Sequence, residues 1–194
     1  TLQTVRREEQ CKGIHWEVAL EEKTGSILPD LTIGADVTGA EELEASEDMA
    51  IKGFEIGSRG FLLEEDEAEA WISENPELNE VLFPYVNGKD LVKGRCTRYV
   101  IDFHNLSQEE ARDYPKAYQH VLDHVKPGRK TNREDRTAKN WWLFRRSGEK
   151  LRGALEGLDR FIGTTRTSKH RVFQFLDNGI RTESNVVVVA LDDA

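Results

Sequence analysis

The sequence predicts a mixed α/β (α+β) fold, in which helices flank a small β-sheet. Two kinds of apolar spacing alternate along its 194 residues. A period near 3.6 predicts amphipathic helices, and short β-branched and aromatic runs bounded by turn residues predict strands. Sixteen aromatic residues accompany a hydrophobic content of 38%, which favours a folded chain over a disordered one.

The first part of the chain is expected to supply short strands followed by an acidic segment. Alternation over residues 14–18 predicts a strand, and residues 36–50 are acidic, as in a helix with a loop. Residues 51–61, IKGFEIGSRGF, predict two strands whose three glycines need a positive φ or a close backbone approach. We therefore expect a lead-in segment over residues 1–50 and the main domain over residues 51–194.

A helix, a strand and a capped helix are predicted next. The helix covers residues 64–75 and ends before the following proline, because the residue that precedes a proline avoids the α region. A strand follows over residues 98–103. Residues 107–110, SQEE, form a capping box that starts another helix. Pro115 is expected to kink or restart this helix.

The C-terminal part should hold a helix, a polar loop and two strands. An apolar stripe predicts a helix from about residue 147 to residue 162. Residues 164–171, TTRTSKHR, are polar at every position, so they are not expected to form a half-buried strand. Strands are predicted over residues 172–176 and 186–190, with a turn at 177–179.

Charge is distributed unevenly along the chain. The formal net charge is -9, but residues 126–171 carry 14 Lys and Arg against 5 Asp and Glu, a local net of about +9 that leaves about -18 elsewhere. This separation indicates one face that binds a polyanion and another that repels it. A basic region packed on an acidic region of the same domain remains the alternative.

The sequence argues against a membrane-spanning helix and against a secreted protein. The longest apolar run, residues 186–191, is far shorter than the roughly 20 residues of a spanning helix. No secretion signal begins the chain, so Cys11 and Cys96 are expected to be free thiols in a reducing cytoplasm. The start at Thr1 suggests a fragment of a longer protein.

A metal-dependent nuclease is the alternative function that the residues leave open. Asp102 and His104 form a D-x-H pair on a predicted strand, and His120 and His124 stand one helical turn apart. Four such ligands could hold a divalent cation for hydrolysis. The H-E-x-x-H and G-x-S-x-G signatures are absent, and no Pro-Pro pair supplies the active-site motif of an adenine methyltransferase.

The basic segment combines phosphate-neutralising cations with side chains that match base edges. Arg and Lys attract the DNA backbone, whereas Arg pairs with guanine and Asn or Gln with adenine. Trp141, Trp142 and Phe144 are expected in the core rather than as stacking platforms. Residues expected to contact the DNA backbone are Lys126, Arg129, Lys130, Arg145 and Arg146. Residues expected to read bases are Arg166, Ser168, Lys169, His170, Arg171 and Gln174.

Seven stretches of the chain also match one family in order: IKGFEIGSRGF, NPELNEVLFPYVNGKDL, RYVIDFHNLSQEEARDYP, VKPGRK, NWWLFRR, LDRFIGTTRTSKHRVFQFL and VVVVALDD. Over residues 33–194 the chain resembles the target-recognition domain of fused type IIG/IIL restriction-modification enzymes and related adenine-N6 DNA methyltransferases. The resemblance implies an α/β domain that clamps double-stranded DNA against a separate Rossmann-like catalytic domain of the same parent chain.

The same resemblance carries further expectations. Residues 1–50 would lead to the absent catalytic domain, and S-adenosylmethionine would be bound by that domain, with no cofactor in this fragment. Residues 164–171 would help to read bases in the major groove. The parent would then methylate adenine in bacterial defence, with or without a fused endonuclease, and the fragment itself would be no enzyme.

Overall fold

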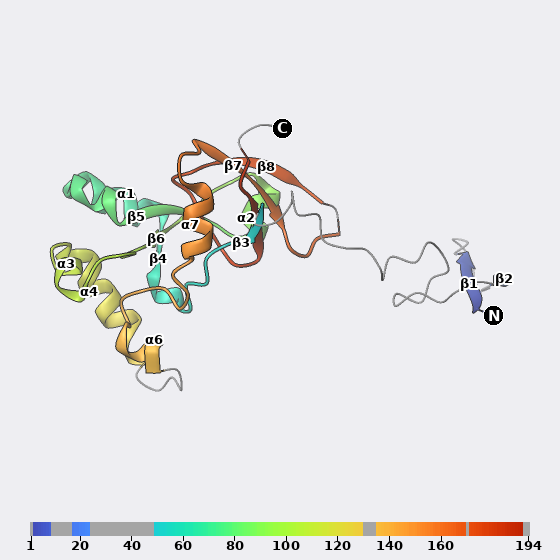
Figure 1. Ribbon diagram of the computed structural model, residues 1–194, viewed down its shortest axis with the longest axis horizontal. Coiled ribbons are helices and arrows are strands. Elements are labelled where there is room, and N and C mark those ends of the chain that lie inside the picture. The colour runs from blue at the N-terminus through green and yellow to red at the C-terminus, as the bar shows by residue number, and fades with distance from the viewer. Residues whose placement is uncertain (1, 9–16, 24–48, 130–134, 170, 192–194) are drawn as a thin grey trace. The chain divides into compact units, whose positions relative to one another are not determined.

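The computed structural model describes residues 2–8, 17–23, 49–129, 135–169 and 171–191 (Figure 1). The chain divides into two compact units, Thr1–Ala45 and Ser46–Ala194. In the first unit, β1 (Leu2–Glu8) and β2 (Glu17–Lys23) form an antiparallel pair whose register runs from Leu2 opposite Lys23 to Glu8 opposite Glu17. The strand predicted at residues 14–18 thus lies partly outside the described residues.

Two four-stranded sheets form the second unit. The first sheet is antiparallel and has the order β3 (Ala50–Lys52), β10 (Val186–Val189), β7 (Arg160–Thr165) and β8 (Phe173–Asp177). The second has the order β4 (Leu62–Glu64), β6 (Arg98–Ile101), β5 (Leu82–Val86) and β9 (Arg181–Thr182), and its β5–β9 pair is parallel. The predicted mixed α/β fold is confirmed, with two small sheets instead of one.

Seven α-helices lie within the described residues of this unit: α1 (Glu65–Glu74), α2 (Gly88–Lys93), α3 (Gln108–Ala111), α4 (Pro115–His124), α5 (Lys126–Arg129), α6 (Asp135–Lys139) and α7 (Glu149–Leu155). Two short 3₁₀ turns are η2 (Arg59–Phe61) and η3 (Pro76–Glu80). Figure 1 shows α1, α3 and α4 at one end of the unit and the first sheet at the other. None of the helices in the described part is long and apolar enough to cross a bilayer.

Local sequence rules place several elements correctly. Helix α1 ends one residue before the Asn75–Pro76 step, and β6 covers most of the strand predicted over residues 98–103. The predicted capping box is present, because the Ser107 hydroxyl accepts from Glu110 N–H and the Glu110 carboxylate accepts from Ser107 N–H. Pro115 begins α4, where a proline lacks no helical hydrogen bond.

One large hydrophobic core contains most of the buried aromatic residues. Phe61, Phe103 and Phe161 are fully buried in it. Trp141 and Phe144 are 5% and 8% exposed, and Trp142 packs against the same core, as expected from the sequence. A smaller buried cluster of Val86, Leu91 and Val186 packs α2 against the first sheet.

Two of the glycines in residues 51–61 meet steric demands that the sequence indicated. Gly57 has a φ of 74°, a conformation that side chains with a Cβ rarely adopt. A Cβ on Gly60 would lie 2.6 Å from the backbone oxygen of His124, which lets η2 pack against the end of α4. The two strands predicted there are wrong in detail, since β3 is followed by isolated bridges and η2.

The helix predicted to continue to residue 162 is also wrong. Helix α7 ends at Leu155, and Gly157 then adopts a φ of 81° that breaks the helical path. Ile162 lies instead in β7, a central strand that also contains Thr164 and Thr165 at 4% and 3% exposure. Threonine is β-branched and packs well between two neighbouring strands, so two residues expected in a polar loop form buried strand.

Candidate nucleic-acid interface

The segment that joins β7 to β8 lies on the surface of the unit. Arg166, Thr167, Ser168, Lys169 and Arg171 are all exposed, whereas the predicted base reader His170 lies outside the described residues. We call residues 166–171 the β7–β8 loop. The described side chains of this loop are accessible to a partner, as expected for residues that read an external ligand.

Hydrogen bonds clamp the base of the β7–β8 loop. The Arg171 guanidinium donates to the backbone oxygen of Thr165 at 3.1 Å. The backbone N–H of Arg166 donates to the backbone oxygen of Asn185 at 2.9 Å. The loop therefore begins and ends on fixed points of the first sheet, which orients its exposed side chains.

Helix α2 borders this loop through a hollow of about 460 Å³. The hollow is lined by Lys89, Val92 and Lys93 on one side and by Arg166, Thr167 and Ser168 on the other. Val92 is 50% exposed. The loop and the helix thus form one continuous surface.

Gln174 occupies a different position from the other predicted base readers. It is half-buried in β8, where Phe173 and Phe175 point outward at 63% and 44% exposure. Its side-chain amide lies beside Gly94, the residue that ends α2.

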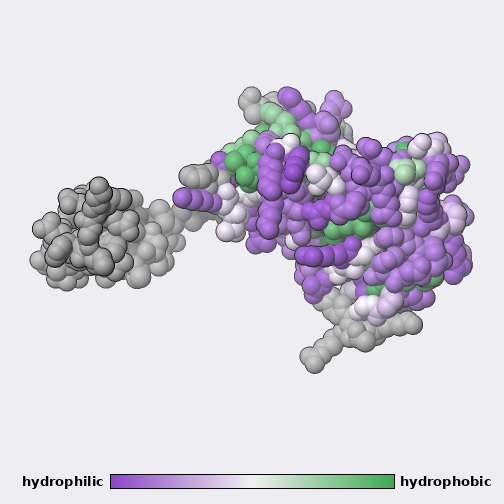
Figure 2. Space-filling view, turned by 180° about the vertical axis from the view of Figure 1, so that it is seen from behind, coloured by the Kyte–Doolittle hydropathy of each residue, from purple (hydrophilic) through white to green (hydrophobic). Residues whose placement is uncertain are grey.

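Figure 2 shows one face of the chain, where hydrophilic surface predominates and hydrophobic residues appear in separate patches.

Three predicted backbone contacts lie at the surface or near it. Lys126 lies over the Trp141 ring at 4.8 Å. Arg145 and Arg146 form ion pairs with Glu55 at 3.1 and 3.2 Å, and their side chains remain 42% and 69% exposed. Lys130 lies outside the described residues.

Arg129 does not lie where a DNA contact requires it. It is 3% exposed and donates to the backbone oxygens of Ile56, Trp141 and Leu143. Burial lowers its pKa to about 10, so it remains a cation at neutral pH. The expectation that it binds a phosphate is therefore corrected: its charge ties residues 141–143 to the segment before η2.

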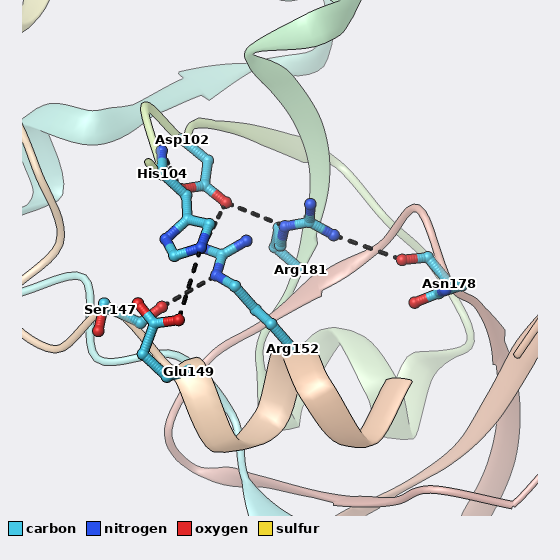
Figure 3. A network of polar contacts seen from close by, with 7 residues as sticks. All are labelled: Asp102, His104, Ser147, Glu149, Arg152, Asn178 and Arg181. Atoms are coloured by element: carbon cyan, nitrogen blue, oxygen red, sulfur yellow. Dashed lines mark hydrogen bonds and ion pairs between the residues drawn. The ribbon is translucent and has the colours of Figure 1, made fainter. Parts of the chain in front are cut away.

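The ligands proposed for a metal are used in other ways (Figure 3). The buried Asp102 carboxylate accepts from Arg152 at 2.7 Å and from Arg181 at 3.0 Å. His104 faces Glu149 at 3.9 Å, and burial together with Arg152 lowers its pKa. Two guanidinium groups thus occupy the carboxylate that a cation would need.

The two helical histidines form a separate pair. The rings of His120 and His124 stack with centroids 4.2 Å apart, and Trp71 contacts His120 edge-on. In the part of the chain that the structure describes, no three His, Cys, Asp or Glu residues are arranged to hold a metal ion. Asp102, His104, His120 and His124 therefore do not assemble the centre that the alternative nuclease requires.

Comparisons with known proteins give one informative result. No family model matches the chain, and no curated protein matches it. Among solved structures, the type IIL restriction-modification enzyme MmeI in complex with DNA matches with a TM-score of 0.69 at 13% sequence identity. The chain is similar in fold to part of MmeI. The match covers 97% of this chain and 25% of the MmeI chain, so the chain spans about a quarter of that enzyme's length.

Cations outside the basic segment were missed by the sequence reasoning. Arg59, Lys89, Lys93 and Arg95 are exposed and line three hollows that share Lys89, and the hollow lined by Lys89 and Lys93 adjoins the β7–β8 loop. They lie outside residues 126–171, the segment that the charge count singled out, although Asp90 is the one acidic residue between positions 81 and 100. The spacing of Lys89 and Lys93, one turn apart on a helix, was the available signal.

Proposed function

We propose that the chain is a sequence-specific DNA-recognition module of an adenine-N6 DNA methyltransferase or restriction-modification enzyme. The observation that carries this proposal is the similarity in fold, over 97% of the chain, to an enzyme whose structure was solved with DNA. The exposed β7–β8 loop supports the proposal, because a surface loop that is held on a rigid sheet can present its side chains to base edges.

The proposed base readers supply the chemistry of the major groove. Arg166, Lys169 and Arg171 can donate to the O6 and N7 acceptors of guanine. Ser168, His170 and Gln174 are secondary readers, and the amide of Gln174 matches the N6 and N7 edge of adenine. Arg171 also holds the loop through Thr165, so it has a positioning role besides any contact with DNA.

Phosphate contacts are proposed for four cations of the basic segment. Lys126, Lys130, Arg145 and Arg146 form this group, from which Arg129 is removed because it is buried. The Glu55 carboxylate forms ion pairs with Arg145 and Arg146 and so partly neutralises their charge. Binding through these residues should weaken steeply as salt rises, since each neutralised phosphate releases counterions.

Methyl transfer is proposed for a catalytic domain of the same parent chain. That domain would bind S-adenosylmethionine and hold the flipped adenine, in a reducing cytoplasm. The 194-residue chain alone should transfer no labelled methyl group from S-adenosylmethionine to DNA. Transfer by the purified chain would overturn the assignment as a non-catalytic module.

Selection from a randomised duplex library tests the recognition proposal directly. The wild-type chain should enrich one short sequence, and Arg166→Ala or Lys169→Ala should relax the preference at one base pair, at a cost of about 1–3 kcal/mol. Lys116→Ala is the matched control, because Lys116 pairs with Glu74 on α1 and lies outside the loop. Enrichment of no sequence by the wild-type chain would contradict the proposal.

A further inference from the structure

We propose that a second cationic surface, formed by Arg59, Lys89, Lys93 and Arg95, binds the phosphodiester backbone of duplex DNA beside the β7–β8 loop. We call it the Lys89 surface. The inference rests on the proposed function and adds to it a phosphate-binding track that lies outside the basic segment of residues 126–171.

Three adjoining hollows define the shape of the Lys89 surface. Their volumes are about 460, 500 and 540 Å³, and Lys89 lines all three. Arg59 lines two of them, Lys93 lines two, and Arg95 lines one. The hollow next to the loop also contains Arg166, so a backbone that follows the hollows passes directly to a proposed base reader.

The cations of the Lys89 surface are not neutralised by ion pairs within the described part of the chain. No ion pair joins Arg59, Lys89, Lys93 or Arg95 to another residue of the described part. Other cations of the chain are occupied: Arg152 and Arg181 bind Asp102, and Arg129 binds backbone oxygens. Exposed, unpaired charges are the ones that a polyanion can neutralise.

Acidic residues on the same surface do not cancel this charge. Asp90 is buried and is neutralised by Arg98 at 2.9 Å. Glu64 and Glu183 also line the hollows. Four cations that form no ion pair within the described residues, with Arg166 beside them, therefore outnumber these two carboxylates in a chain whose net charge is -9. The surface is thus a second cationic region of a chain that is acidic on average, which favours one docking orientation.

Asn185 fixes the Lys89 surface relative to the loop. Its side-chain oxygen accepts from Gly88 N–H at 2.9 Å, and its backbone oxygen accepts from Arg166 N–H at 2.9 Å. Tyr85 and Thr165 each line one of the hollows, and their buried hydroxyls have no hydrogen-bond partner among the described residues. Buried polar groups of this kind call for a partner from solvent or ligand.

The test compares two variants that remove the same charge. A labelled duplex of about 30 base pairs, long enough for the roughly 10 base pairs of one helical turn, is titrated with each chain over a salt series. Lys89→Ala/Lys93→Ala should flatten the log–log salt dependence by about 0.9 for each lost phosphate contact. Arg112→Ala/Lys116→Ala, which removes two exposed cations outside both the basic segment and the three hollows, should keep the wild-type slope.

The outcomes separate this inference from the proposed function. A wild-type chain that binds with a salt dependence matched by Lys89→Ala/Lys93→Ala would overturn the Lys89 surface and leave the recognition module intact. Absence of wild-type binding even at about 50 mM salt would overturn both. Lys89→Arg/Lys93→Arg should retain the wild-type slope, because the charge is kept; loss of binding in this variant would contradict the electrostatic account.

Discussion

Asn185 accepts a hydrogen bond from the backbone N–H of Gly88 at 2.9 Å, across 97 positions of the sequence. Gly88 begins α2, and the neighbouring backbone oxygen of Asn185 holds Arg166 at the start of the β7–β8 loop. One residue between β9 and β10 thus connects the two parts of the surface to which we assign DNA binding.

Asn185→Ala should loosen this connection. We expect the free energy of unfolding to fall by about 1 kcal/mol, the usual net worth of such a hydrogen bond, and the Gly88 amide to lose protection from hydrogen exchange. Urea denaturation and exchange measurements check both. Asn79→Ala, which removes an exposed bond to Pro76, should leave Gly88 protection unchanged; equal protection in Asn185→Ala and the wild type would refute the connection.

Arg129→Met should destabilise the chain strongly, by about 3 kcal/mol or more, because it leaves several buried backbone oxygens without a donor. Arg146→Met is the matched control, since Arg146 is 69% exposed and its pair with Glu55 lies at the surface. We expect it to change stability by no more than about 0.5 kcal/mol. Denaturant titration of the two variants distinguishes them, and equal losses would contradict the buried role of Arg129.

Glycine replacements should act in opposite directions at two positions. Gly57→Ala should cost about 1–2 kcal/mol, since φ is 74° and the new Cβ would meet the Arg145 Cβ at 2.6 Å. Gly153→Ala, in the interior of α7 with open space around it, should stabilise by about 0.4–1 kcal/mol. Thermal denaturation reports both signs; a stabilising Gly57→Ala would exclude the strained conformation.

His120 should make stability depend on pH. Burial and the stacked His124 lower the pKa of His120 in the folded chain, against the opposing charges of Glu67 and Asp123. The unfolded chain therefore takes up a proton below about pH 6.5 that the folded chain does not. The free energy of unfolding should decrease as the pH is lowered from about 7 to about 5.5, and His120→Gln should make this decrease smaller. Denaturation at the two pH values checks it; an identical fall in the variant would be the contrary result.

Asp102 should act as a structural counter-ion and not as a metal ligand. Asp102→Asn leaves Arg152 and Arg181 close together without their shared charge, and we expect a loss of about 3 kcal/mol or more. A chelator should leave the melting temperature of the wild-type chain unchanged. A fall in melting temperature on adding the chelator, reversed by Mg²⁺, would restore the metal interpretation.

Local signals predicted the elements that depend on neighbouring residues. The capping box at residues 107–110, the start of α4 at Pro115 and the end of α1 follow from the chemistry of a few adjacent positions. The apolar spacing from Leu151 to Ile162 wrongly predicted one continuous helix, because the spacing continues past Gly157, where the helical path is broken. A glycine two residues beyond the last helical position was the overlooked stop signal.

The candidate site was harder to predict because partners distant in sequence determine it. Arg129 is removed from the surface by backbone oxygens of residues 141–143 and Ile56. Lys89 is placed beside Arg166 through Asn185. A count of charges along the chain detects neither arrangement, because it treats a buried cation and an exposed one alike.

The strand order of the two sheets has a consequence for how the second unit folds. Ala50 in β3 pairs with Val189 in β10, and Tyr85 in β5 pairs with Arg181 in β9. Each sheet therefore takes a strand from the C-terminal end of the unit, and closing such long chain segments costs entropy before the contacts form. During synthesis neither sheet can be completed until these late residues emerge from the ribosome, and folding should be slower than that of a helical domain of equal length.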